Sequence, residues 1–94
     1  MNIKTKTFIS KIIKITVFFT LLFTIFGYET NDWNGIKENE DQTLLQKLFN
    51  RYYFTIVSFS TVGFGDITPN TFTLKILMIL YSFMIIIPIY ELIR

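Results

Sequence analysis

The sequence predicts an all-α membrane protein in which two membrane-spanning helices flank a re-entrant half-helix. The first supporting observation is composition, since the 94 residues are 51% hydrophobic with a mean hydropathy of +0.45. The second is a pair of uncharged apolar blocks. The third is a short helical pattern between these blocks, followed by two alternate glycines. A soluble domain of this length buries too little surface to hide 11 Phe and 5 Tyr. We therefore expect one domain over residues 1–94, with lipid as its solvent.

The first apolar block is uncharged over residues 15–28. It reaches about 20 residues, enough to span a bilayer, when it is extended back to Ile9. This extension includes Lys11 and Lys14, and lysines near a helix end can reach the membrane interface with their long side chains. We therefore predict the first span over residues 9–28. A cleaved signal peptide is the alternative, but bulky residues surround the candidate cleavage site and a second span follows.

The second apolar block is uncharged over residues 76–90, and with its flanks it predicts a span over residues 71–93. Residues 1–14 contain four lysines and no acidic residue, and Arg94 follows the second span. Because Lys and Arg favour the cytoplasmic side, we expect a multi-pass protein with both termini cytoplasmic. Residues 1–14 form either a short interfacial helix or a disordered leader, and both alternatives stay open.

The segment after the first span, residues 29–43, is predicted to be an outer loop. Five acidic residues lie between Glu29 and Lys47. We expect this charged loop to be solvated, the alternative being a negatively charged vestibule. Trp33 is either a membrane-interface anchor or a loop contact, and the sequence does not decide between the two.

A third helical pattern covers residues 44–59. Thr43 can cap its start. Because the segment is short and carries Lys47 and Arg51, it does not fit a third span, and we predict a re-entrant half-helix instead. Its apolar residues recur at helical spacing: Leu44, Leu45, Leu48, Phe49, Tyr52, Tyr53 and Ile56.

The loop after the half-helix, residues 60–66, contains Gly63 and Gly65 at a spacing of two. Non-helical backbone at membrane depth must be buried in protein or line a water-filled cavity. Glycine adopts left-handed backbone conformations at little cost, so alternate glycines let successive carbonyls point the same way and replace the hydration shell of a cation. The side chains of Val62 and Phe64 then turn outward. One chain supplies only one wall of such a site, so this geometry requires an oligomer. The alternative is an ordinary Gly-x-Gly turn.

The run Thr61-Val62-Gly63-Phe64-Gly65-Asp66 resembles the selectivity-filter signature of potassium channels. The whole layout resembles the miniature viral potassium channels of the Kcv type. The resemblance implies a homotetramer that conducts K+ passively, with a pore helix over residues 44–59 and a filter over residues 60–66. It implies no cofactor and no nucleic-acid partner, and it places the channel in a host-cell or virion membrane. It also implies that K+ is bound by the carbonyls of four residues: Thr61, Val62, Gly63 and Phe64.

The same resemblance assigns three residues to the support and outer mouth of the filter: Asp66, Ser58 and Tyr53. Asp66 either braces the filter or raises the cation concentration at its mouth. Ser58 stands where the family usually has threonine. Tyr53 and Phe54 stand where many relatives carry tryptophan, and Phe54 cannot donate a hydrogen bond to Asp66. The support behind the filter is therefore expected to be more apolar than in those relatives.

In the second span, Ser82 and Phe83 are the candidates for lining an inner cavity. The alternative for Ser82 is a hydrogen bond to its own helix, and for Phe83 it is packing against lipid or a helix. Either Asn70 or Thr71 is expected to cap this span. Pro88 is its one candidate kink.

The absence of Cys and His from the sequence excludes thiol nucleophiles, imidazole acid–base catalysis and Cys/His metal sites. No nucleophile has a neighbouring base, so we do not expect an enzyme. Two rival functions remain: a less selective cation channel of the same architecture, and a holin-like protein that makes membrane lesions. Glu91 and Arg94 either pair between subunits or lie in water.

Overall fold

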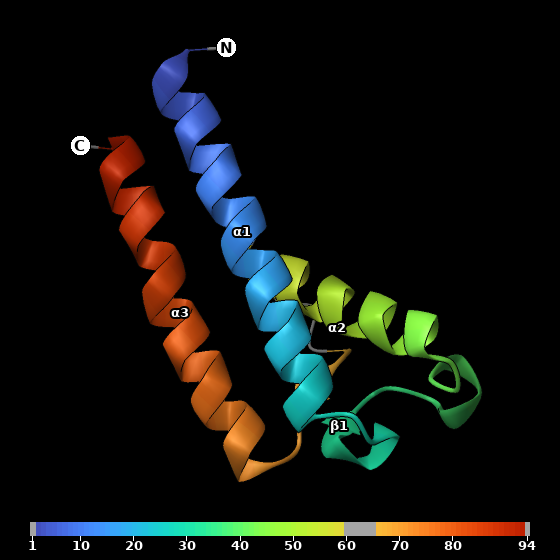
Figure 1. The fold of residues 1–94 in the computed structure, drawn as a ribbon. Coiled ribbons are helices and arrows are strands. Elements are labelled where there is room, and N and C mark those ends of the chain that lie inside the picture. Colours follow the sequence, from blue (N-terminus) through green and yellow to red (C-terminus); the bar gives the residue numbers. More distant parts are fainter. Residues whose placement is uncertain (1, 60–65, 94) are drawn as a thin grey trace.

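The computed structural model describes residues 2–59 and 66–93. Its helices are α1 (Ile3–Phe26), α2 (Leu44–Phe59) and α3 (Phe72–Ile93), and a two-residue strand β1 (Trp33–Asn34) pairs with β2 (Thr68–Pro69). Short 3-10 turns at Thr30–Asp32 and Glu38–Glu40 shape the outer loop. Figure 1 shows α1 and α3 as long antiparallel neighbours whose termini lie at the same end of the molecule, while the shorter α2 crosses beside α1.

This arrangement confirms the expected fold class, with two long apolar helices and a short helix between them. Helices α1 and α3 are each long and apolar enough to cross a membrane. Only 33% of the most apolar stretch of α1 and 17% of that of α3 are buried within the chain. Their apolar surface therefore faces outward, unlike that of a core helix in a soluble protein, and requires lipid or further protein to cover it.

The first helix differs from the predicted span over residues 9–28, since it begins at Ile3 and ends at Phe26. The side chain of Asn2 accepts a hydrogen bond from the backbone N–H of Thr5 at 2.8 Å and so provides the N-cap. Residues 3–14 are thus the first turns of α1, and they form neither a separate interfacial helix nor a disordered leader.

Hydroxyl caps define the starts of the other two helices. The Thr43 hydroxyl accepts from the N–H of Gln46 at 3.1 Å, while the Gln46 side chain accepts from the N–H of Thr43 at 3.0 Å. This reciprocal capping box confirms the predicted role of Thr43 at the start of α2. At the start of α3, the Thr71 hydroxyl accepts from the N–H of Leu74 at 3.2 Å. Of the two expected caps, Thr71 and not Asn70 therefore fills the role.

The core is a cluster of aromatic rings around Phe23, which is fully buried on α1. The rings come from α1, the outer loop, α2 and α3, so one side chain joins every main segment of the fold. Their centroids lie 5.5–6.2 Å from that of Phe23, in tilted or edge-on geometries that aromatic pairs favour. The rings that contact Phe23 are Phe19, Trp33, Phe54 and Tyr81.

Trp33 is a buried loop contact and not an exposed interface anchor, which resolves the two interpretations of this residue. Its ring packs 5.0 Å from that of Phe54, and its indole N–H donates to the carbonyl of Gly27 at 2.8 Å. The same residue begins β1, which pairs antiparallel with β2 through the partners Trp33 and Pro69. The sequence did not predict this strand pair, because two-residue strands show no alternating pattern.

We predict that Phe23→Ala destabilises the fold by about 3–5 kcal/mol, because it removes the ring shared by four packed neighbours and leaves a cavity. Thermal unfolding followed by circular dichroism in detergent measures this loss. Phe18→Ala is the matched control, since Phe18 lies on the same helix but is 53% exposed; its expected loss is about 0.5 kcal/mol or less. Equal losses in the two variants would contradict the central role of Phe23.

Candidate functional site

The residues predicted to bind the ion lie outside the described residues, so the candidate site is built from the segments that flank them. The described chain leaves α2 at Phe59 and resumes at Asp66, the last residue of the predicted filter. The predicted ion-binding residues of the filter that lie outside the described part of the chain are Thr61, Val62, Gly63, Phe64 and Gly65.

The structure joins two of the predicted support residues directly. The Tyr53 hydroxyl, on α2, donates to a carboxylate oxygen of Asp66 at 3.0 Å. This hydrogen bond raises the pKa of the Tyr53 phenol above its ordinary value, because the carboxylate of Asp66 favours the protonated hydroxyl. Phe54, the next residue along, turns instead into the aromatic core. The last residue of the predicted filter is therefore connected back to the helix that precedes the filter.

Ser58, the third predicted support residue, is half-buried near the end of α2. It lines a cavity of about 260 Å³ between α2, the start of β2 and α3. Tyr53 and Asp66 line the same cavity, so the three residues predicted to support the filter lie around one space.

The two candidate cavity residues of α3 are both exposed in the single chain. The Ser82 hydroxyl donates to the carbonyl of Met78 at 2.9 Å, a bond within its own helix. This is the alternative that the sequence left open for Ser82. The Phe83 side chain is 66% exposed. Neither residue contributes to the buried core of the chain.

A buried charge cluster, formed by Asp41, Lys47 and Arg51, lies where the outer loop meets α2. Arg51 is fully buried and forms an ion pair with Asp41, and the Lys47 ammonium lies 3.3 Å from the other carboxylate oxygen of Asp41. Both basic side chains also reach the end of α1. Arg51 donates to the carbonyl of Gly27 at 2.9 Å and Lys47 to that of Tyr28 at 2.7 Å. The cluster therefore connects the outer loop, α2 and the C-terminus of α1.

The outer loop is largely solvated, as expected, and Asp41 of this charge cluster is the exception among its acidic residues. Asp41 is 2% exposed, although its neighbours in the loop are largely exposed. Gly27 caps the C-terminal end of α1, where partial negative charge gathers and carbonyls lack partners within the helix, and Arg51 satisfies its carbonyl. Lys47 satisfies the carbonyl of the next residue, Tyr28. Lys47 and Arg51 lie four residues apart and therefore share one face of α2. Their spacing was the available sequence signal, but nothing local showed that this face turns inward.

The pKa of Asp41 shows which influence dominates in the cluster. Burial by itself raises the pKa, but hydrogen bonds from Arg51, Thr30 and Asn50, together with the charge of Arg51, outweigh burial and lower it from 3.8 to about 2. Thr30 and Asn50 donate to the two carboxylate oxygens at 2.7 and 3.1 Å. Asp41 therefore stays ionised throughout the physiological range.

Deeper along α2, three hydroxyl groups from three helices meet at Thr55. The Tyr81 hydroxyl of α3 donates to the carbonyl of Thr55 at 2.8 Å, and the Thr20 hydroxyl of α1 lies 3.3 Å from the Thr55 hydroxyl. Tyr81 and Thr55 are fully buried. Where lipid replaces water, such hydrogen bonds between helices help hold them together. Sequence patterns alone do not reveal this network, since hydroxyl residues also bond within their own helices.

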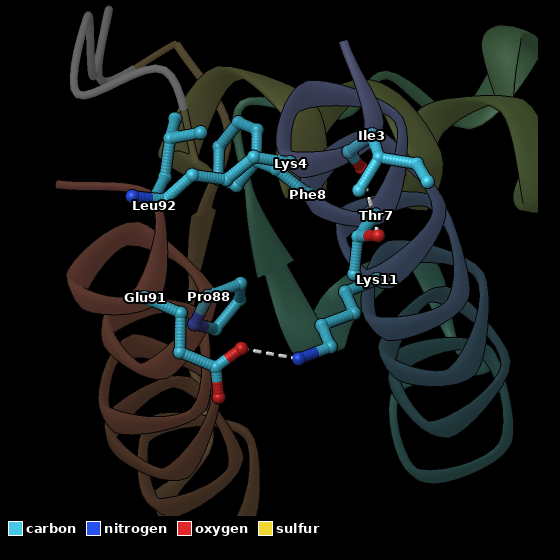
Figure 2. A pocket seen from close by; sticks show the side chains of 8 residues that line it. All are labelled: Ile3, Lys4, Thr7, Phe8, Lys11, Pro88, Glu91 and Leu92. Atoms are coloured by element: carbon cyan, nitrogen blue, oxygen red, sulfur yellow. Dashed lines mark hydrogen bonds and ion pairs between the residues drawn. The ribbon is translucent and has the colours of Figure 1, made fainter. Parts of the chain in front are cut away.

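At the end of the molecule where the termini lie, α1 and α3 are joined by an ion pair between Lys11 and Glu91. Figure 2 shows the two side chains facing each other, with Pro88 of α3 beside them, at a pocket of about 200 Å³. Glu91 thus has a partner in its own chain while 45% of its side chain stays exposed, and its pairing with Arg94 between subunits stays a prediction. Arg94 lies outside the described residues. Pro88 lies within α3 without ending it.

We predict that Arg51→Met destabilises the fold by about 3–5 kcal/mol, because it leaves the carboxylate of Asp41 buried without its main partner. Adding Asp41→Asn to Arg51→Met should recover part of the loss by removing that charge. Lys37→Met, at an exposed lysine of the same loop, is the control and should leave the unfolding temperature nearly unchanged. A double variant no more stable than Arg51→Met would contradict the role of the ion pair.

Because the pKa of Asp41 is lower in the folded chain than its ordinary value, its ionisation stabilises the fold above pH 3.8, and this stabilisation is lost as the pH falls from 3.8 to about 2. We expect the stability difference between the wild type and Asp41→Asn to be constant near neutrality and to shrink over that interval. The measurement is the unfolding midpoint of both proteins in detergent as a function of pH. A difference that does not change below pH 4 would contradict the assignment.

Comparison with known proteins places this architecture in a family. A family model described as "Ion channel" matches residues 8–90. The chain is also 37% identical over 68 residues to the two-pore potassium channel 4 of Arabidopsis thaliana, covering 72% of this chain and 23% of that protein. It is 39% identical over 62 residues to the hyperpolarization-activated voltage-gated potassium channel of Methanocaldococcus jannaschii, covering 66% of this chain and 29% of that protein.

The potassium channel protein 1 of the same archaeon is 49% identical over 35 residues, which cover 37% of this chain and 10% of that protein. The chain thus spans less than a third of the length of these curated relatives. No solved structure matches the chain. The family model nevertheless covers most of both long apolar helices, together with α2 and the loop after it. The chain therefore belongs to the ion-channel family and is a channel protein rather than an enzyme.

Proposed function

We propose that the chain is the subunit of a potassium-selective channel that conducts K+ passively through a homotetrameric pore. One observation carries this proposal: the run Thr61-Val62-Gly63-Phe64-Gly65 connects the end of α2 to Asp66, and Tyr53 of α2 holds Asp66 by a hydrogen bond. The similarity of the chain to potassium channels of a plant and of an archaeon supports K+ as the conducted ion.

In this proposal, α2 is the pore helix and residues 60–66 are the filter. Alternate glycines let the carbonyls of Thr61, Val62, Gly63 and Phe64 point toward one axis and replace the water around K+. Helix α2 runs from the outer loop toward the middle of α1 (Figure 1). Its C-terminal end therefore lies about midway along the two long helices. The partial negative charge at that end favours a cation near the filter. K+ ions then move by displacement between adjacent sites.

An oligomer follows from the need for several walls around one ion path, because each chain supplies a single wall. The resemblance to potassium channels is the basis for proposing that this oligomer is a homotetramer. The exposed apolar surfaces of α1 and α3 are consistent with contacts to lipid and to other copies. In the assembly, Ser82 and Phe83 of α3 are our candidates for the inner cavity. The exposed large apolar residues of α3 include Ile79, Phe83, Ile86, Ile87 and Tyr90.

We propose that the channel is an integral membrane protein with both termini on the cytoplasmic side. The two termini lie at the same end of the molecule in Figure 1, and the lysines of the first turns of α1 belong to that end. The outer loop and Asp66 then face the opposite side. The compact layout of two spans and one pore helix is the basis for proposing a Kcv-type channel of a host-cell or virion membrane.

Reconstitution in a planar bilayer with asymmetric K+ and Na+ tests the proposed function. We expect unitary currents that reverse near the K+ equilibrium potential and that Ba2+ blocks. Reversal midway between the K+ and Na+ potentials would instead identify a less selective cation channel and overturn the proposal.

We predict that Gly65→Ala reduces the K+ current to background, because an added Cβ opposes the backbone conformation that aligns the carbonyls. Asn39→Ala, at an exposed residue of the outer loop, is the control and should conduct like the wild type. Both variants are compared in the same bilayers after reconstitution of equal amounts of protein. A K+-selective current that persists in Gly65→Ala would contradict the filter, while an unselective leak in all variants would identify a lesion-forming protein.

A further inference from the structure

We infer that the outer loop holds the chain segment that leaves the proposed filter, and that this contact sets how long the filter stays conductive. The contact, which we name the outer clasp, consists of residues 31–35 and residues 66–70. The inference rests on the proposed function, because it assigns the outer clasp a role in K+ conduction. The outer clasp differs from the hydrogen bond between Tyr53 and Asp66, since it is formed by the outer loop and largely by main-chain contacts.

The outer clasp is built first from main-chain pairing. Strands β1 and β2 are antiparallel, with Asn34 opposite Thr68. The backbone N–H of Asn70 donates to the carbonyl of Asp32 at 2.8 Å. Such pairing fixes the register of the two segments, because a slip by one residue would turn every side chain to the opposite face.

Side chains of the outer clasp add to this pairing. The Asn70 amide donates to the carbonyl of Asn31 at 3.2 Å, and the Asn34 amide donates to the hydroxyl of Thr68 at 3.3 Å. Both bonds cross between the loop and the segment after the filter. The outer clasp therefore has contacts along its whole length.

The two segments of the outer clasp also approach each other closely at Gly35 and Asp66. The φ angle of Gly35 is +90°, in the region that favours glycine, and a Cβ added to it would lie 1.5 Å from the carbonyl oxygen of Asp66. The backbones of Gly35 and Asp66 are therefore in direct contact. Tyr53 restrains the side chain of Asp66 while Gly35 lies against its main chain, so two different elements limit its movement.

The loop side of the outer clasp is itself anchored. Trp33 is buried in the aromatic core and donates to the carbonyl of Gly27 at the end of α1. Further along the loop, Asp41 is held by Arg51 of α2. The outer clasp thus transmits the positions of α1 and α2 to Asp66, which is covalently bonded to the last glycine of the proposed filter.

This placement has a consequence for conduction. Ion coordination requires several carbonyls to keep their geometry together, and a site whose supporting groups are loose loses it. A loosened outer clasp should therefore let the filter leave its conducting conformation more often. Because K+ bound in the filter stabilises the conformation that binds it, raising K+ on the outer side should oppose this loss by mass action.

A reversible cross-link tests the outer clasp. The chain has no Cys, so Asn34→Cys with Thr68→Cys introduces a single thiol pair. Directly opposite residues of an antiparallel pair have Cα atoms about 4.5–5.5 Å apart, within the range that a disulfide spans. After oxidation we expect longer mean open times at low outer K+ than in the reduced state, reversed by dithiothreitol. Asn34→Cys alone is the control and should not respond to oxidation.

Gly35→Ala tests the same contact by loosening it. We expect the mean open time at low outer K+ to fall about tenfold, because the added Cβ must push Asp66 away and the backbone conformation opposes it. Raising outer K+ should restore much of the open time, whereas Asn39→Ala in the same loop should behave as the wild type. A contact that only aids folding would lower the number of channels and leave the open time of each channel unchanged.

The outcomes separate the two proposals. If the wild type shows no K+-selective current, the proposed function fails. If the wild type is K+-selective but neither Gly35→Ala nor the oxidised double variant changes its open times, the outer clasp has no role in conduction and the inference is overturned. Should Gly35→Ala fail to fold, the comparison of the oxidised and reduced double variant decides alone.

Discussion

Asp41 and Arg51 form an ion pair in which both side chains are buried, and the rest of the outer half of the molecule is arranged around it. A buried charge is tolerated only with a partner and with its remaining hydrogen-bonding positions filled. Lys47, Thr30 of the loop and Asn50 of α2 fill the positions around the carboxylate. The carbonyls that follow α1, those of Gly27 and Tyr28, fill the positions around the two basic side chains. The loop, α2 and the end of α1 therefore cannot move independently without exposing an unpaired charge. Their mutual position is fixed by electrostatics as well as by packing.

Farther from the outer loop, aromatic packing and hydrogen bonds from hydroxyl groups hold the helices in their mutual positions. Phe23 contacts rings from four segments, and the carbonyl of Thr55 receives the hydroxyl of Tyr81 across two helices. In lipid, apolar surface alone gives helices little reason to associate, since lipid tails solvate them equally well. Close ring packing and hydrogen bonds between helices supply the specificity that the hydrophobic effect supplies in water. Helix α2 is consequently held at both its outer and inner ends.

For the proposed channel, this means that the segment between Phe59 and Asp66 begins and ends at restrained points. One is the end of α2, and the other is held by Tyr53 and by the outer clasp. In the proposed channel, the outer clasp thus partly offsets the predicted loss of polar support behind the filter. The loop that forms it is one that sequence patterns alone describe as solvated. The outward-facing surfaces of α1 and α3 remain for lipid and for neighbouring copies.

The features that can be predicted from sequence are those that depend on neighbouring residues: two apolar blocks, a short helix from Leu44 to Phe59 capped by Thr43, and alternate glycines between the two spans. Hydropathy, helical period and capping act within one or two turns, so a single sequence displays them. The packing of the folded chain was needed to establish that Asp41 is buried, that Trp33 joins the core, and that Gly35 lies against Asp66. These contacts join residues distant in sequence, and their energies depend on which face of each helix turns inward. The start of α1 at Ile3 was missed for a related reason, because hydropathy shows where a helix is apolar and not where it begins.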